Sequence, residues 1–203
     1  MEKIDTAAQD RLDMERLAGG DDMGLNALME RHAGPLFQFL FRSLNDEEDA
    51  NDLAQETFVR VYKHRDAYDG SKFTTWLYTI ASNLARSEFR RRRRHPNVSL
   101  EANRAEDGNC FADTLTSNAG LPNEDLEHAE KQLAVRSAVN SLPDDLRKAT
   151  ILCEWEEFTV AEAAQILNTS RKSVESRLYR ARHRLRQKLG KWLNEDVESK
   201  MLT

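Results

Sequence analysis

The hydrophobic residues of this chain recur mostly three or four positions apart, which is the spacing of one face of an α-helix. Residues 25–44 predict such a helix, and Pro35 is expected to bend it or to divide it in two. Its apolar face consists of Leu25, Leu28, Met29, His32, Leu36, Phe39 and Leu40. A short amphipathic helix through Leu12 and Leu17 precedes it, and Gly19, Gly20 and Gly24 are expected to break this first helical stretch. No segment shows the sustained alternation of a β-strand, so the pattern predicts an all-α fold.

Residues 45–68 predict a helix with an acidic start and a polar outer face. Its first acids, from Asp46 to Asp49, suit a helix N-terminus, whose partial positive charge favours carboxylates. The expected buried stripe consists of Leu53, Thr57, Phe58, Val61 and Tyr62. The polar side chains Asp52, Gln55, Glu56 and Arg60 lie on other faces. This polar face is either simply solvated or a docking surface for a basic partner helix, and composition does not separate the two.

A third helix ends in an unusual run of arginines. Asp69 and Gly70 mark a turn, after which Ser71 is expected to cap the helix. The apolar stripe consists of Phe73, Trp76, Leu77, Ile80 and Leu84, with Phe89 near its end. The basic residues at the end of the helix are Arg86, Arg90, Arg91, Arg92, Arg93 and Arg94. Five consecutive arginines cover every side of a helix and cannot all find acidic partners nearby. Phosphate contact, which releases condensed counterions, is therefore favoured over a solubilising charge run.

The composition changes after this helix. Residues 96–125 are rich in Asn, Asp, Glu, Ser and Gly with few apolar side chains, which predicts a flexible, acidic linker. Helical periodicity then returns with Leu133, Val135, Ala138, Val139 and Leu142. Pro143 suits the first turn of a further helix, which carries Leu146, Ala149, Ile151, Leu152 and Trp155. The chain is thus expected to form two small helical domains, residues 1–95 and 126–203, joined by the linker.

The second domain ends in a predicted helix-turn-helix. Thr159 and Glu162 form a capping box at the start of a short helix, Asn168 suits the left-handed conformation of a tight turn, and Ser170 is placed to cap the next helix. The apolar positions of the pair are Val160, Ala163, Ala164, Leu167, Val174, Leu178, Ala181, Leu185 and Leu189. Such a pair presents its second helix to the major groove of DNA. Residues 190–203 are expected to fray.

The second helix of this pair is strongly basic. Nine basic side chains and one acid, Glu175, lie between Arg171 and Lys191, so this segment carries a net charge of +8 in a chain whose total is −5. The candidates for DNA contact are Arg171, Lys172, Ser173, Glu175, Ser176, Arg177 and Arg180. A surface helix pair with merely solvated arginines is the simpler alternative, which the capped turn and the charge asymmetry disfavour.

Composition excludes several other classes of protein. No apolar run approaches the length of a membrane span, and the N-terminus lacks the pattern of a secretory signal, so no membrane insertion and a cytoplasmic location are expected. Cys110 and Cys153 have no Cys or His neighbour at metal-ligand spacing, so neither a metal nor another cofactor is expected. A metal-dependent nuclease would need paired carboxylates or a metal cluster beside a basic groove. The acids of residues 45–68 lie on a helix with no His or Cys cluster, so a nuclease is not expected, and no enzymatic activity is expected.

Two separated blocks of the sequence resemble bacterial sigma factors of the small extracytoplasmic-function (ECF) group. The first block is DANDLAQETFVRVY, residues 49–62, followed by FTTWLYTIASNLARSEFRRRRR, residues 73–94. The second is SLPDDLRKATIL, residues 141–152, followed by FTVAEAAQILNTSRKSVESRLYRARHRLRQKL, residues 158–189. The resemblance covers both predicted domains and leaves out the N-terminal extension, the linker and the tail. Two blocks in this order are far more specific than one helix-turn-helix.

The resemblance implies a division of labour between the two domains. It implies that Asp52, Gln55, Glu56 and Arg60 dock onto a coiled coil of the β′ subunit of core RNA polymerase. It implies that the helix of residues 73–94 meets the minus-ten promoter element, with Asn83 near a flipped base and the arginines on the DNA backbone. The helix-turn-helix would recognise the minus-thirty-five element, and its flank would bear on the polymerase β flap. The family also implies an anti-sigma factor as a partner.

The sequence departs from the family pattern at several of these positions. Many relatives carry Asp where this chain has Ser87 and an aromatic residue where it has Glu88. Glu175 stands where Lys is frequent, and its carboxylate could accept a hydrogen bond from a cytosine amino group. Lys172 replaces a frequent Gly and could add a phosphate or guanine contact. The main alternative function is a polymerase-independent helix-turn-helix regulator, which would leave the first block unexplained.

Overall fold

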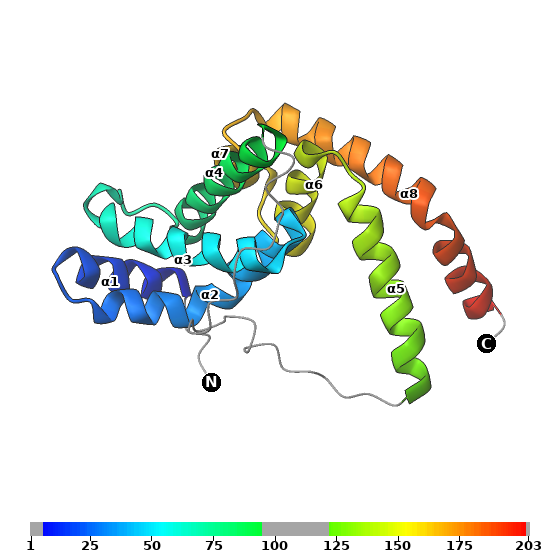
Figure 1. The fold of residues 1–203 in the computed structure, drawn as a ribbon, viewed down its shortest axis with the longest axis horizontal. Helices are drawn as coiled ribbons and strands as arrows, with labels where there is room; N and C mark the ends of the chain where they lie inside the picture. Colours follow the sequence, from blue (N-terminus) through cyan, green and yellow to red (C-terminus); the bar gives the residue numbers. More distant parts are fainter. Residues whose placement is uncertain (1–5, 95–121, 202–203) are drawn as a thin grey trace. The chain divides into compact units, whose positions relative to one another are not determined.

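The computed structural model describes residues 6–94 and 122–201 of the chain, and every regular element in these ranges is helical (Figure 1). The chain divides into two units, which are described separately. The N-terminal unit contains α1 (Thr6–Ala18), α2 (Met23–Leu44), α3 (Glu47–Lys63), the short 3-10 helix η1 (Arg65–Ala67) and α4 (Phe73–Arg94). The C-terminal unit contains α5 (Pro122–Asn140), α6 (Asp144–Thr150), the π-helical turn η3 (Ile151–Trp155), α7 (Val160–Ile166) and α8 (Arg171–Met201). Cys110 and most of the predicted linker lie outside the described residues.

Helix α2 is the centre of the N-terminal unit and packs against α1, α3 and α4. Most of its predicted face is buried, with Leu28, Leu36, Phe39 and Leu40 fully inaccessible to solvent, whereas Leu25 and Met29 are half-buried. Pro35 lies within a single helix, so the predicted division of this segment into two helices does not occur. The proline is exposed. Buried residues before and after it hold the segment together although one backbone hydrogen bond is lost at the ring.

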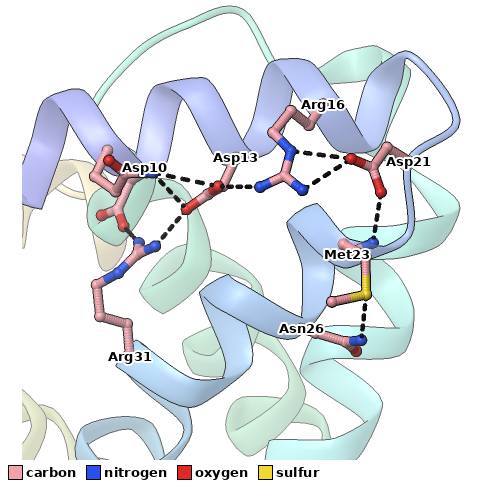
Figure 2. A network of polar contacts seen from close by, with 8 residues as sticks. Asp10, Asp13, Arg16, Asp21, Met23, Asn26 and Arg31 are labelled. Atoms are coloured by element: carbon pink, nitrogen blue, oxygen red, sulfur yellow. Dashed lines mark hydrogen bonds and ion pairs between the residues drawn. The ribbon is translucent and has the colours of Figure 1, made fainter.

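Helix α1 is fixed to α2 by buried charges rather than by an apolar stripe alone (Figure 2). Asp10 and Asp13 on α1 are 2% and 0% exposed, and Arg31 of α2 donates hydrogen bonds to both carboxylates. His32 Nε2 lies 2.8 Å from Asp10 Oδ1. Leu17 is buried as predicted, but Leu12 is 54% exposed. A buried carboxylate is tolerated only with such partners, so the network fixes the position of α1.

Gly19 and Gly20 follow the end of α1 as expected, whereas Gly24 lies inside α2 and does not break a helix. Gly24 is a site of close backbone approach between two helices. A Cβ atom at residue 24 would stand 2.3 Å from the carbonyl oxygen of Asp13. Because only glycine lacks this atom, the short distance between α1 and α2 depends on Gly24.

Helices α3 and α4 form the rest of the N-terminal core. Asp46 caps α3 by accepting a hydrogen bond from the Asp49 amide at 3.0 Å, as the acidic start predicted. The buried residues of α3 are Ala50, Ala54, Thr57, Phe58 and Val61, and those of α4 include Phe73, Leu77, Tyr78, Ala81, Leu84 and Ala85. Tyr62 was predicted to be buried but is 38% exposed.

The start of α4 differs from the prediction in one detail. Ser71 does not directly precede the helix, which begins at Phe73. Its amide donates to Asp69 Oδ1 at 3.0 Å, and its hydroxyl also bonds to this carboxylate. These hydrogen bonds lower the pKa of Asp69. Asp69 therefore organises the turn, which is a common use of aspartate in loops.

The C-terminal unit begins earlier than predicted and buries fewer of its apolar residues. Helix α5 starts at Pro122, so residues 122–125 are helical and do not belong to the predicted linker. Ala138 and Val139 are buried as expected, but Leu133 and Val135 are 65% and 37% exposed. Two predicted core positions of α5 are therefore on its surface.

The π-helical turn η3 explains why Trp155 is 37% exposed although its spacing predicted a core position. The amide of Glu156 donates to the carbonyl of Ile151 at 3.1 Å, a hydrogen bond that spans five residues instead of four. Such a turn changes the phase of the helical repeat. Leu146, Ala149, Ile151 and Leu152 before or at its start remain buried.

The helix-turn-helix has the predicted local structure. Glu162 N donates to Thr159 Oγ1 at 3.3 Å, while Thr159 N donates to Glu162 Oε2 at 2.9 Å. Asn168 adopts a left-handed conformation with φ 48°, and Ser170 Oγ accepts from the Ser173 amide at 3.2 Å to cap α8. Helix α8 continues to Met201, so the predicted fraying of residues 190–201 is wrong.

Candidate nucleic-acid interface

The first turns of α8 present polar and basic side chains on the surface opposite to a buried apolar stripe. Val174, Leu178 and Ala181 are at most 5% exposed and hold the helix against its own unit. The exposed candidates are Arg171, Lys172, Glu175, Ser176 and Arg180, and the half-buried ones are Ser173 and Arg177. The predicted residues therefore lie together on the outside of a helix fixed from behind, as major-groove contact requires.

Arg177 differs from its neighbours because it is directed toward α6. Its side chain is 22% exposed, and its Nε atom lies 3.8 Å from Asp145 Oδ2. Further along α8, Arg182 Nη2 lies 2.7 Å from Glu154 Oε1 of η3. These ion pairs connect α8 to the elements that precede the helix-turn-helix. Arg177 is thus less accessible to a ligand than Arg180, which is exposed.

Tyr179 is a candidate that the sequence analysis missed. It is 76% exposed, and helical spacing places it beside Glu175 and Ser176 on the outer surface of α8. The signal was present in the sequence, because residue 179 is out of phase with the buried positions Val174 and Leu178. An exposed tyrosine can contact both bases and sugars through its ring and its hydroxyl group.

The arginine run of α4 is less uniform than its sequence. Asn83, Arg90, Arg91 and Arg94 are exposed, Arg86 and Arg92 are half-buried, and the side chain of Arg93 lies outside the described residues. Arg91 donates two hydrogen bonds of 2.8 Å to Glu88, which raise the pKa of the guanidinium further. Arg92 also contacts Glu88, together with two acids of α3. Two of the five arginines therefore do have acidic partners.

The polar face of α3 contains a local ion pair and two exposed apolar residues. Asp52 and Gln55 are exposed. Arg60 Nε donates to Glu56 Oε1 at 2.8 Å, and this hydrogen bond lowers the pKa of Glu56. Val59 and Tyr62 are 42% and 38% exposed. Helical spacing places Val59 beside Gln55 and Glu56, so the candidate docking face combines charged and apolar groups, as protein interfaces do.

Two family signatures match the chain, one in each unit. The signature described as Sigma-70 region 2 matches residues 28–95, and that described as Sigma-70, region 4 matches residues 132–185. The RNA polymerase sigma-H factor of Pseudomonas aeruginosa is 31% identical over 192 residues, which cover 94% of this chain and 98% of that protein. The ECF RNA polymerase sigma factor SigW of Bacillus subtilis is 29% identical over 178 residues, which cover 87% and 94%. The chain belongs to the ECF sigma factors.

Two solved structures have a similar fold. CnrH, in complex with the cytosolic domain of CnrY, aligns over 90% of this chain and 97% of its own with a TM-score of 0.63 and 25% identity. The sigma factor RpoE of Bartonella quintana, in complex with the anti-sigma factor NepR, aligns over 81% and 96% with a TM-score of 0.61 and 25% identity.

As an ECF sigma factor, the protein directs core RNA polymerase to promoters. The matched region 2 contains the polar face of α3 and the arginine run of α4, and the matched region 4 contains the helix-turn-helix. All three groups of candidate residues thus fall within the parts of the chain that define the family.

The described residues contain no other recognisable chemical site. No three His, Cys, Asp or Glu side chains among them are placed to hold a metal ion. Cys153 is half-buried, and burial raises the pKa of its thiol, which keeps it in the less reactive protonated form. No helix in the same ranges is long and apolar enough to cross a membrane.

Proposed function

We propose that this sigma factor divides promoter recognition between α4 and α8 and docks onto RNA polymerase through α3. The observation that supports this proposal most directly is the capped helix-turn-helix, whose second helix is fixed by Val174 and Ala181 and exposes Arg171, Lys172 and Arg180. A basic, rigidly backed helix of this kind suits the major groove. The protein itself has no catalytic role in this proposal and requires no metal or other cofactor.

In the minus-thirty-five element, the exposed residues of α8 contact bases and phosphates. Arg180 and Glu175 are the candidates for base contact, because Arg pairs with guanine and a carboxylate accepts from cytosine. Tyr179 adds an aromatic surface next to them. The remaining candidates are Arg171, Lys172, Ser173, Ser176 and Arg177, of which Arg177 is placed for a phosphate rather than a base because Asp145 restrains it.

In the minus-ten element, α4 contacts the opened strand. Asn83 is exposed and lies near the flipped base in this proposal. Flipping a base costs a few kcal/mol of stacking energy, so phosphate contacts must offset that cost. The exposed Arg90, Arg91 and Arg94 supply such contacts, and Arg86 and Arg93 are further candidates.

The polar face of α3 docks onto a coiled coil of the β′ subunit. Asp52, Gln55, Glu56 and Arg60 provide the charged and amide groups, and the adjacent Val59 and Tyr62 provide apolar area. In the C-terminal unit, the flank of the helix-turn-helix bears on the β flap. We place the protein in the cytoplasm, where the polymerase acts on DNA.

An anti-sigma factor is a further proposed partner. RpoE, which has a similar fold, was solved in complex with the anti-sigma factor NepR, and CnrH was solved in complex with the cytosolic domain of CnrY. The partner of this chain would compete with core RNA polymerase for the same sigma surfaces.

In vitro transcription with purified core RNA polymerase and a library of promoter sequences tests this function. We expect discrete start sites that appear only when the protein is added, with a shared sequence motif at two upstream positions. The absence of transcripts, together with tight binding of the protein alone to a palindromic DNA site, would contradict the proposal and favour a polymerase-independent regulator.

A further inference from the structure

One arginine joins the last turns of α4 to the first turn of α3. Arg92 Nη2 contacts Asp49 Oδ2 and lies 3.2 Å from Asp46 Oδ2, and Arg92 Nε donates to Glu88 Oε1 at 3.3 Å. We call these four side chains the arginine clasp. Asp46 and Asp49 belong to the start of α3, while Glu88 and Arg92 are one turn apart on α4. The clasp thus connects a helix of the candidate polymerase surface with a helix of the candidate DNA surface.

One carboxylate of the clasp is also held by the cap of α3, independently of Arg92. Asp46 uses Oδ1 to cap α3 by accepting from the Asp49 amide, and this leaves Oδ2 directed at Arg92. The side chain of Asp49 is 23% exposed and that of Glu88 is 11% exposed. Partial burial reduces the screening that makes surface ion pairs weak, and the guanidinium fork suits several carboxylate oxygens at once.

Arg90 and Arg94 of the same run have a different environment. Arg90 is exposed and has no carboxylate partner among the described residues. Arg94 is exposed, and its Nε donates to the carbonyl of Arg90 at 3.3 Å. Such side chains gain a partner when they meet a phosphate. Arg92 would instead have to leave three carboxylates for one phosphate, so its position disfavours DNA contact.

We propose that Arg92 is a positioning residue that holds the end of α4 against the start of α3, rather than a phosphate contact in the minus-ten element. Its effect on transcription is indirect, because it fixes the orientation of α4 relative to α3 and so the direction that Asn83 and Arg90 of α4 face. This inference rests on the proposed function for its consequence at the promoter, but the clasp itself exists in the protein alone.

Amide hydrogen exchange of the full-length protein tests the clasp without polymerase or DNA. In Arg92→Ala and in Asp49→Asn, we expect faster exchange at the end of α4 and at the start of α3 together. Arg90→Ala is the matched control, because it removes an arginine from the same helix without a carboxylate partner in the described structure, and it should leave the start of α3 protected. Unchanged exchange at the start of α3 in Arg92→Ala would overturn the clasp.

Promoter binding by the reconstituted holoenzyme then separates positioning from phosphate contact. The probe is a fluorescent fragment of a promoter identified by the transcription assay, titrated at several salt concentrations. Arg90→Ala should reduce the slope of log affinity against log salt concentration by about 0.7 to 0.9, as the loss of one phosphate contact does. Arg92→Ala should lower affinity by about tenfold or less with an unchanged slope.

Asp49→Asn gives results of opposite sign under the two interpretations. If Arg92 is a positioning residue, Asp49→Asn lowers promoter affinity as Arg92→Ala does, and the double variant is no weaker than the weaker single variant. If Arg92 instead contacts a phosphate, Asp49→Asn removes a competing carboxylate and raises promoter affinity. Under the same interpretation, Arg92→Ala reduces the salt slope. Either result overturns the proposal. Failure of the unmodified protein to bind polymerase would contradict the proposed function. The hydrogen-exchange experiment would still test the clasp, because it needs neither polymerase nor DNA.

Discussion

Left-handed backbone conformations show how single residues shape this fold. Among the described residues, Asn45, Glu157 and Asn168 are the non-glycine residues with positive φ. Asparagine tolerates this conformation better than most residues, and both asparagines stand where a helix ends. Glu157 also adopts this conformation, with φ 55°, although glutamate does not tolerate it as asparagine does. It follows η3 directly before the helix-turn-helix, where the chain must turn sharply.

Glu157→Gly should therefore stabilise the C-terminal unit. The left-handed conformation destabilises a residue with a Cβ atom by about 1 to 2 kcal/mol, and glycine avoids this strain. Glycine also makes the unfolded chain more flexible, which offsets about 0.5 to 1 kcal/mol of the gain. We expect the free energy of unfolding to rise by about 0.5 to 1 kcal/mol in urea titrations followed by circular dichroism. Asn168→Gly is the control and should change stability less. A clear loss of stability in Glu157→Gly would show that its side chain has a structural role.

Replacement of Gly24 in the N-terminal unit should have the opposite effect and lower stability. Gly24→Ala places a Cβ atom 2.3 Å from the Asp13 carbonyl oxygen, so α1 must move away from α2 and strain the Asp10–Arg31–Asp13 network. Overpacking of this kind costs about 1 to 3 kcal/mol, measurable by thermal or urea unfolding. Gly190→Ala in α8 is the control, since nothing lies within 4 Å of its Cβ position, and it should stabilise the helix by up to about 1 kcal/mol. Equal effects of the two substitutions would contradict the close-approach argument.

At the scale of elements, local signals in the sequence were sufficient for the helix-turn-helix. Thr159, Glu162, Asn168 and Ser170 act through hydrogen bonds and backbone preferences within a few residues, and the structure has each of the predicted features. The prediction that Trp155 is buried was wrong because a π-helical turn changes the helical phase. The turn contains no glycine or proline, so no local signal in the sequence marks it. Leu133 and Val135 were misplaced because apolar spacing does not say whether a neighbouring element covers a helix face.

The same limit applies to the candidate site on α8. Spacing identified the outer residues, but the ion pair between Arg177 and Asp145 joins positions far apart in sequence, which a periodic pattern does not reveal. Likewise, the contacts of Arg92 with Asp46 and Asp49 connect two helices and were not foreseen from the arginine run. Residue type and phase predicted which side chains are basic and exposed, and tertiary contacts decide which of these are available to DNA.

Arg180 and Arg177 should consequently differ in their effects on promoter recognition. Arg180→Ala should cost about 1 to 3 kcal/mol of binding free energy, concentrated on one base pair of the upstream element. Arg177→Ala should weaken binding about equally for all sequences, because Asp145 directs it away from the bases. Competition binding of the holoenzyme to a promoter and its single-base variants measures both effects. A base-specific loss in Arg177→Ala would show that the ion pair with Asp145 breaks on DNA binding.

At the scale of the whole molecule, the chain carries a net charge of −5 although its two DNA-binding candidates are strongly basic. Acids elsewhere in the chain offset this charge, among them Glu47, Glu48, Asp49, Asp52 and Glu56 of α3. Such a separation of charge suits a protein that binds RNA polymerase and promoter DNA without adhering to DNA along its whole length. Membership of the ECF sigma factors agrees with this arrangement, since one family region covers α2 to α4 and the other covers the helix-turn-helix.

The central claim is that the two units contact two separate promoter elements when the protein is bound to polymerase. Site-specific photo-crosslinking tests it most directly, with p-benzoyl-L-phenylalanine in place of Tyr179 on α8 or Asn83 on α4 and holoenzyme assembled on a labelled promoter. We predict that residue 179 crosslinks to the upstream element and residue 83 to the non-template strand of the downstream element, in both cases only when core RNA polymerase is present. Crosslinks from both positions to one element, or equal crosslinking of the protein alone, would contradict the account.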